Sequence, residues 1–230
     1  TGTLAATDSA GVIAQANWNN LTLLEGESSE IVADVSGSAQ ATEVTVSWAS
    51  NNTWYSTGRG EENNAFTGAD QTLMLGYLDT GAATTTAVDI SGLPDELTAE
   101  GYDVYVYLLG GVPAKGGGYR VLDGDSGAAL TGTVLAEAPA NPDSYVEVVP
   151  EGDVAGVGDY ILFCGLASPN IIVEASTADG LGFGDNPRAP INAVQLVTPA
   201  SCAVQPPAPR FTGITLNADG TVTVTWTGDG

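Results

Sequence analysis

The chain contains no histidine and only five basic residues, against 28 aspartates and glutamates. Without histidine it lacks the side chain most often used as a general base and as a transition-metal ligand. A formal net charge of -23 argues against nucleic acid as a partner, because such binding depends on lysine and arginine neutralising phosphates. The same charge argues against binding to anionic membrane surfaces.

Long apolar runs and cysteines are scarce as well. No stretch approaches the roughly 20 apolar residues of a membrane-spanning helix, so we expect no membrane insertion. An initiator methionine and a signal peptide are both missing, which is typical of a mature or excised product. Cys164 and Cys202 match no zinc pattern. In an acidic, exported chain they predict a disulfide if their Cα atoms lie within about 7 Å, although Cys164 could equally be a buried free thiol.

The acidic residues that are present are scattered singly rather than gathered into one acidic run. This distribution is typical of a solvated surface, where salt weakens the repulsion between the charges. Ordinary solubility would require the same distribution. We therefore expect a secreted or cell-surface protein whose acidity is a background property.

Period-two alternation of apolar and polar residues dominates the chain and predicts β-strands with one buried face. Residues 102–109 are apolar on both faces, which predicts a central strand. Turns rich in Gly, Asn, Asp and Pro separate the strands, and only residues 94–97 predict a helical turn. Without α/β alternation, the sequence predicts an all-β, two-sheet antiparallel sandwich in preference to a barrel. The predicted strands are 30–35, 43–48, 85–90, 102–109, 145–149, 159–163, 170–175 and 191–197.

The predicted organisation is one main domain followed by a short C-terminal unit. Residues 1–200 carry all of these strands, and residues 201–209 form a stiff linker that contains three prolines. Residues 210–230 have the pattern of a β-hairpin. Because two strands cannot form an independent core, this hairpin either begins a further, truncated β module or packs onto the main domain.

Three short motifs carry a resemblance to a known family. They are Gly101–Tyr107 (GYDVYVY), Gly118–Val121 (GYRV) and Pro190–Leu196 (PINAVQL). Over roughly residues 10–198, the chain resembles the galactose-binding-like jelly rolls, in particular the malectin-like modules. Segments 14–20 (AQANWNN) and 46–54 (VSWASNNTW) resemble a variant found in large secreted proteins of Planctomycetes and Verrucomicrobia.

This resemblance implies a jelly-roll sandwich first and sugar binding second, because a fold does not determine a function. It also implies that residues 210–230 are the start of an immunoglobulin-like module.

The strongest local signal for a ligand site lies between residues 50 and 64. Sugars present apolar ring faces and hydroxyl groups, so a sugar site needs aromatic platforms beside amide, carboxylate and guanidinium groups. This segment supplies two aromatic side chains, four asparagines, one arginine and two glutamates. In the alternative, the tryptophan is a core residue at a strand end and the asparagines form turns. The candidate ligand-binding residues are Trp54, Tyr55, Asn51, Asn52, Arg59 and Glu61.

Lys115, Tyr119 and Arg120 flank a run of three glycines and form a second candidate site. As a binding loop they would hold an anionic group such as a sugar sulfate or a uronate, with Tyr119 and Arg120 as ligand-binding residues. The alternative, which we favour, is a hairpin loop whose Arg120 pairs with a nearby acid. Arg188, alone before the last predicted strand of the main domain, should also find a carboxylate partner and anchor its loop.

Cofactors are not expected, and calcium is the one metal ion that the sequence leaves open. Asp123–Gly127 resembles the start of an EF-hand loop, but a glycine at the fifth position and no glutamate at the twelfth break that motif. A β-sandwich can still hold Ca²⁺ through scattered carboxylates and carbonyls. Catalytic templates such as a Gly-x-Ser-x-Gly elbow are missing. We therefore predict that the chain is not an enzyme.

Two functions compete on these observations. The first is a non-catalytic carbohydrate-binding module of a secreted multidomain protein, with a polysaccharide or other glycan as its partner. The second is a structural subunit of an extracellular filament or surface layer that self-associates through strand edges. Lysine, which often protects exposed strand edges, is almost missing from this chain. Adhesion to a protein partner is a third, weaker reading.

Overall fold

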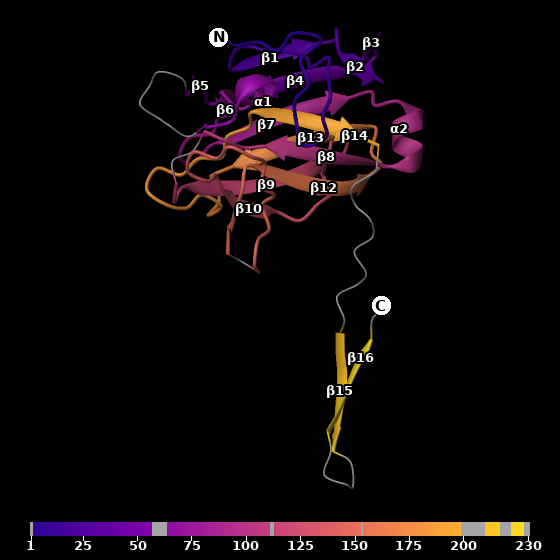
Figure 1. The fold of residues 1–230 in the computed structure, drawn as a ribbon, viewed down its shortest axis with the longest axis vertical. Helices are drawn as coiled ribbons and strands as arrows, with labels where there is room; N and C mark the ends of the chain where they lie inside the picture. The colour runs from indigo at the N-terminus through magenta and orange to yellow at the C-terminus, as the bar shows by residue number, and fades with distance from the viewer. Residues whose placement is uncertain are drawn as a thin grey trace. The chain divides into compact units, whose positions relative to one another are not determined.

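The computed structural model describes residues 2–56, 64–110, 113–152 and 154–198, together with the backbones of two C-terminal strands (Figure 1). The chain splits into two compact units, Thr1–Pro199 and Ala200–Gly230.

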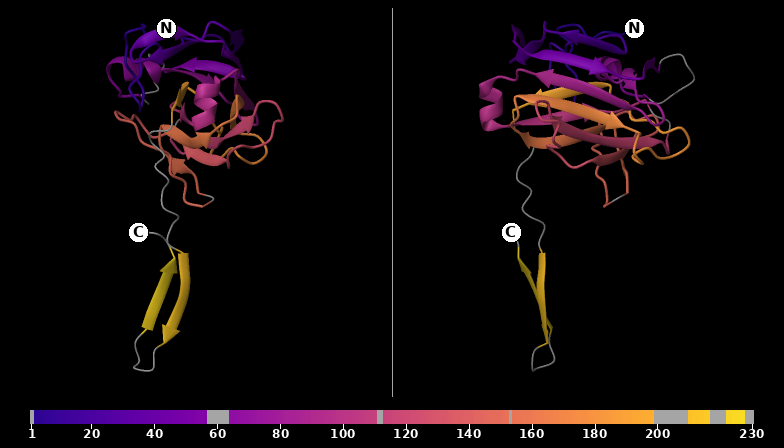
Figure 2. Two further views of the ribbon diagram at one scale, coloured as in Figure 1. Left: turned by 90° about the vertical axis from the view of Figure 1, so that its right-hand side faces the viewer. Right: turned by 180° about the vertical axis from the view of Figure 1, so that it is seen from behind.

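Two antiparallel sheets form the layers of the first unit (Figures 1 and 2). The larger sheet has seven strands in the order β1-β4-β7-β13-β9-β10-β11. They are β1 (Glu25–Ser28), β4 (Thr45–Ala49), β7 (Thr85–Ser91), β13 (Asn170–Ser176), β9 (Gly116–Asp123), β10 (Val134–Glu137) and β11 (Gly156–Val157). The smaller sheet consists, in order, of β12 (Tyr160–Leu166), β8 (Tyr102–Tyr107) and β14 (Ala193–Val197). The predicted all-β antiparallel sandwich is confirmed, and among the described strand pairings of these two sheets only the two-residue pairing of β10 with β11 is parallel.

Two hairpins and two six-residue helices complete the described part of this unit. The hairpins pair β2 (Val32–Val35) with β3 (Ser38–Ala41) and β5 (Asn52–Tyr55) with β6 (Gly76–Asp79). The helices are α1 (Gly68–Leu73) and α2 (Asp95–Glu100). A backbone bridge between Leu78 and Ile191 brings the β5–β6 hairpin beside the start of β14.

Some predicted elements differ from those observed. Helix α2 overlaps the predicted helical turn at 94–97, whereas α1 lies in a segment for which the sequence predicted no helix. Residues 145–149 alternate like a strand, but they make only an isolated parallel bridge, between Glu147 and Tyr160. Neither helix is long and apolar enough to cross a membrane.

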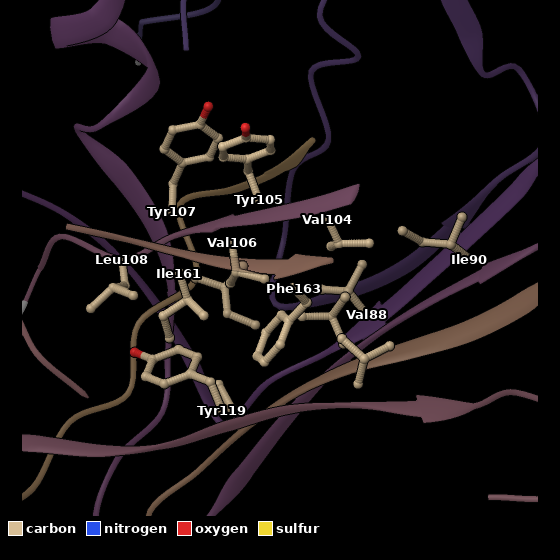
Figure 3. Close-up of a cluster of buried hydrophobic side chains, with 14 of the residues drawn as sticks. Val88, Ile90, Val104, Tyr105, Val106, Tyr107, Leu108, Tyr119, Ile161 and Phe163 are labelled. Atoms are coloured by element: carbon tan, nitrogen blue, oxygen red, sulfur yellow. The ribbon is translucent and has the colours of Figure 1, made fainter. Parts of the chain in front are cut away.

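The main core lies between the two sheets and is built from alternate residues of strands in both sheets (Figure 3). Val88 and Ile90 of β7 face this layer, as do Val104 and Val106 of β8. Each fully buried aliphatic side chain of this size contributes about 1.5–3 kcal/mol. Tyr119 of β9 is also buried here, with 0% of its surface exposed, and its Oη donates to the Pro190 carbonyl at 3.0 Å.

Strand β8 is covered on its second face as well, where Tyr105 and Tyr107 point away from Tyr119 (Figure 3). Residues near the N-terminus supply this cover through hydrogen bonds. The Val12 N–H donates to Tyr107 Oη at 2.8 Å, and this hydroxyl donates to Gln195 Oε1 at 2.7 Å. The predicted central strand at 102–109 is therefore confirmed, since β8 lies between β12 and β14 with both faces buried.

The second unit contains the antiparallel strands β15 (Arg210–Leu216) and β16 (Val222–Thr227). A register shift between Phe211 and Gly213 adds one residue to β15. The register pairs Phe211 with Trp226, Ile214 with Val224, and Leu216 with Val222.

The close packing around Gly116 generates a stability prediction. A Cβ atom at Gly116 would overlap the Ala136 carbonyl oxygen and the Phe183 ring. Gly116→Ala is therefore expected to lower the free energy of unfolding by about 3 kcal/mol, because overpacking forces the backbone to shift. Urea denaturation measures this change. The matched control is Gly132→Ala, where no described atom lies within 4 Å of the new Cβ and we expect a change below about 0.5 kcal/mol. Equal stability of the two variants would contradict the packing described here.

Candidate functional site

The β5–β6 hairpin brings an aromatic ring and a carboxylate onto one face. Its register pairs Asn52 with Asp79 and Trp54 with Tyr77. Side chains alternate along a strand, and directly paired residues share a face. Asn52, Trp54, Tyr77 and Asp79 therefore lie on the same side, which we call the Trp54 face, and Tyr55 lies on the opposite side.

Arg188 reaches the Trp54 face from the loop that precedes β14. Its Nε lies 3.5 Å from Asp79 Oδ1, with side-chain exposures of 34% and 13% for the two residues. Arg188 Nη1 also donates to the Pro187 carbonyl at 3.1 Å, which holds the guanidinium against its own loop. The carboxylate partner that the sequence predicts for Arg188 is confirmed.

Buried hydroxyl groups fix the end of β6 behind Asp79. Ser50 Oγ donates to the Asp79 carbonyl at 3.2 Å and lies 2.7 Å from Thr86 Oγ1. Thr80 Oγ1 donates to the same Thr86 oxygen at 2.7 Å, and both threonines are fully buried. Tyr77 Oη donates to the Gly110 carbonyl at 2.8 Å. The position of Asp79 is thus set by bonds from several strands and loops.

The resulting surface combines four kinds of chemistry. The half-buried indole of Trp54 is an apolar platform, and exposed Asn52 supplies an amide that can both donate and accept. Asp79 is mostly buried and brings a carboxylate to the edge of this surface, and Arg188 can donate hydrogen bonds in a planar fork. An apolar platform beside paired donors and acceptors matches a molecule that has both a hydrophobic face and hydroxyl groups.

Only part of the candidate site predicted around residues 50–64 is brought together. Trp54 and Asn52 lie on the Trp54 face, but Tyr55 packs on the other side, where a Cβ at Gly76 would lie 3.7 Å from its ring. Asn51 Oδ1 accepts the Gly81 N–H at 3.0 Å, so this asparagine stabilises a turn, as the alternative interpretation expected. Arg59 and Glu61 lie outside the described residues.

The second predicted site, around the glycine run, is not supported by the geometry. Tyr119 is fully buried in the core and cannot contact a surface ligand, so its assignment as a ligand-binding residue is wrong. Arg120 donates through Nε and Nη2 to Glu174 Oε1 at 2.7 and 2.6 Å, respectively, across paired positions of β9 and β13. The favoured alternative, an ion pair with a nearby acid, is confirmed for Arg120.

Asp79 is the functional candidate that the sequence did not single out. It follows three apolar or small residues in the segment GYLD, which has the pattern of an ordinary strand. Asp79 belongs to the Trp54 face because of its pairing register with β5. Arg188, which lies beside it, comes from a loop that is distant in the sequence. No local motif carries that information.

The described residues bear on two further predictions, a bound calcium ion and a disulfide between Cys164 and Cys202. There, no group of three or more acidic, cysteine or histidine side chains is arranged to hold a metal ion. In the EF-hand-like segment, hydrogen bonds from Ser126 and Ser168 lower the pKa of Asp123 to about 2. Cys164 is exposed on β12 rather than buried, and Cys202 lies outside the described residues, so their disulfide stays a prediction.

A different acidic group, Asp159, has a distinctive environment behind the smaller sheet. It is fully buried, and its Oδ1 accepts the Val146 N–H at 3.0 Å. Its Oδ2 has no hydrogen-bond partner. Burial raises the pKa of Asp159 from 3.8 to about 7, although the bond from Val146 opposes this shift. The carboxyl group therefore changes its protonation state close to neutral pH.

Comparison with known proteins finds no matching family model, no matching curated protein and no matching solved structure. The resemblance to malectin-like modules therefore stays a prediction that depends on three short motifs.

The raised pKa of Asp159 predicts how stability depends on pH. Stability from the protonated carboxyl is fully present below the pKa of the unfolded chain, and it is lost as the pH rises through about 7. We expect the wild type to lose about 3 kcal/mol more than Asp159→Asn between about pH 5 and pH 8, since about two pKa units separate pH 5 from the raised pKa and each corresponds to about 1.4 kcal/mol. Denaturation of both proteins across this range measures the difference. If the free energy of unfolding changes with pH equally in the two proteins, ionisation of Asp159 does not destabilise the fold and this prediction is wrong.

Proposed function

We propose that this chain is a non-catalytic carbohydrate-binding module of a secreted or cell-surface protein and that the Trp54 face is its binding surface. The observation that carries this proposal is the shared face of Trp54, Asn52 and the Asp79–Arg188 pair. Each group matches one feature of a sugar ring. The indole would stack on the apolar ring face, while the amide, carboxylate and guanidinium would exchange hydrogen bonds with hydroxyl groups.

Preorganisation supports this proposal. Asp79 is held by Arg188 and by the hydroxyl groups behind β6, so it does not have to be ordered when a ligand arrives. Ordering side chains on binding typically costs about 0.5–1.5 kcal/mol for each side chain. A surface that is already ordered loses less of its binding energy in this way.

A pair of variants on the same hairpin tests the proposal. Trp54→Ala is expected to weaken retention by a polysaccharide at least tenfold, because it removes the stacking platform. Tyr55→Ala is the matched control, since Tyr55 lies on the opposite face and should leave retention nearly unchanged. Affinity electrophoresis through gels containing different polysaccharides, with thermal unfolding as a check of folding, measures both effects.

Two outcomes would overturn the proposal. The first is unchanged retention of a folded Trp54→Ala variant by every polysaccharide that retains the wild type. The second is the reverse ranking, in which folded Tyr55→Ala loses retention and Trp54→Ala keeps it. If Tyr55→Ala unfolds, Tyr55→Phe replaces it as the control, because the ring that packs beside Gly76 is kept.

One observation favours the alternative function, a structural subunit that self-associates through strand edges. Exposed valines gather near β11, the short edge strand of the larger sheet. Val149 is 68% exposed, Val154 67% and Val157 53%. Scattered apolar residues need no partner, but a group of them at a sheet edge is typical of a contact with another chain.

This alternative predicts association that depends on salt. Copies that each carry a charge of -23 repel one another, and this repulsion is screened at high ionic strength. Under the alternative, sedimentation at high salt should show a mass that rises with protein concentration, and Val157→Lys should prevent the rise. A constant monomer mass at every salt concentration would remove this alternative.

A further inference from the structure

Tyrosines gather on the outer face of the smaller sheet. Tyr105 and Tyr107 of β8 are buried there, and Tyr160 of β12 lies with its ring centroid 5.8 Å from that of Tyr105. Tyr145 belongs to the segment that runs beside β12, where the Val148 N–H donates to the Tyr160 carbonyl at 2.8 Å. The Tyr145 and Tyr160 rings meet at an interplanar angle of 83°, with centroids 6.4 Å apart. Both residues are half-buried, so each keeps part of its surface exposed, and we call this pair the aromatic corner.

Carboxylates accompany both rings of this corner. Exposed Glu147 accepts a hydrogen bond from Tyr160 Oη through Oε2 at 3.4 Å. Asp70 of α1 accepts one from Tyr145 Oη at 2.7 Å. Asp159, the neighbour of Tyr160 in the chain, is fully buried with one oxygen that has no hydrogen-bond partner. Glu147 and Asp70 therefore favour positive charge at the corner, and Asp159 adds to this once its carboxyl group ionises near pH 7.

The behaviour of Tyr160 is consistent with this negative environment. Its pKa is raised to about 12, first by burial and then by the charges of Glu147 and Asp159, among other groups. In the described part of the chain, the ion pairs join Arg120 to Glu174 and Arg188 to Asp79, and neither includes an acid of this corner. The acids here have no cation of their own in that part of the chain.

We propose that the corner formed by Tyr145 and Tyr160, together with Glu147, binds an alkylammonium group. The faces of aromatic rings carry negative electrostatic potential, and two rings at a right angle can contact a compact cation from two sides. Glu147 adds a full opposite charge beside them. The net charge of -23 raises the local concentration of cations around the whole protein.

This site is chemically different from the Trp54 face. The Trp54 face has guanidinium and amide donors, as a sugar requires, whereas the aromatic corner combines ring faces with carboxylates. The ammonium group could come from a small quaternary amine or from a lysine side chain of a protein partner. Both sources share the charge that the corner recognises, and they differ in their hydrogen-bond donors.

Titration of the full chain with choline chloride, followed by NMR, tests the charge requirement. The control ligand is 3,3-dimethylbutan-1-ol, which has the shape of choline without its charge. Choline is expected to give saturable shifts of the Val146, Glu147 and Tyr160 amides, and the neutral alcohol should bind at least tenfold more weakly. Nα-acetyl-lysine amide forms the second arm, and tighter binding of this ligand than of choline would identify a lysine side chain as the source. Equal binding of choline and the alcohol, or no saturable shift with either cation, overturns the proposal.

Variants then separate the ring and charge contributions. Tyr145→Leu should weaken choline binding roughly 2- to 30-fold through loss of one ring face. Tyr160→Phe keeps the ring and should retain binding within about 2-fold. Glu147→Gln should weaken binding roughly 2- to 5-fold, whereas Glu151→Gln, an equal charge change at another exposed acid, should have a smaller effect. If Tyr145→Leu fails to fold, the two glutamine variants still decide, and equal effects from them would contradict a site at Glu147.

Discussion

Burial of both faces of β8 is the constraint on which the rest of the first unit depends. Val104 and Val106 join the core between the two sheets, while Tyr105 and Tyr107 need a second covering layer on the outer side. The N-terminal segment and residues 145–148 supply that layer, and they do so mainly through side-chain hydrogen bonds and ring contacts. The aromatic corner is the solvent-facing margin of this second layer.

Both proposed sites arise where segments distant in the sequence meet at the margins of the smaller sheet. On the Trp54 face, a hairpin and the loop before β14 bring together an indole and an ion pair. At the aromatic corner, the outer tyrosines meet an irregular segment that carries Tyr145 and Glu147. The two sites differ in charge. The Trp54 face contains a guanidinium group, whereas the described groups of the aromatic corner are only acids and aromatic rings.

Periodicity in the sequence predicted the strands whose side chains alternate, such as β7 and β13, and apolar residues on both faces predicted the central strand β8. It missed β9, because three glycines at its start leave no apolar pattern, although their lack of Cβ atoms permits close packing around Gly116. Composition identified Trp54 and Asn52 but grouped Tyr55 with them, since composition carries no information about faces. Asp79 could not be predicted, because its place in the site depends on a pairing register and on the distant Arg188.

The N-terminal segment covers the outer tyrosines of β8 without belonging to either sheet. Val12 and Ile13 are held to Tyr107 and Gln195 by single hydrogen bonds and contribute no strand to either sheet. A protease that trimmed this segment would remove none of the strand pairings in the two sheets. It would instead expose the buried rings of Tyr105 and Tyr107 to water. The N-terminal segment thus keeps Tyr105 and Tyr107 buried on the outer face of the smaller sheet without adding a strand to it.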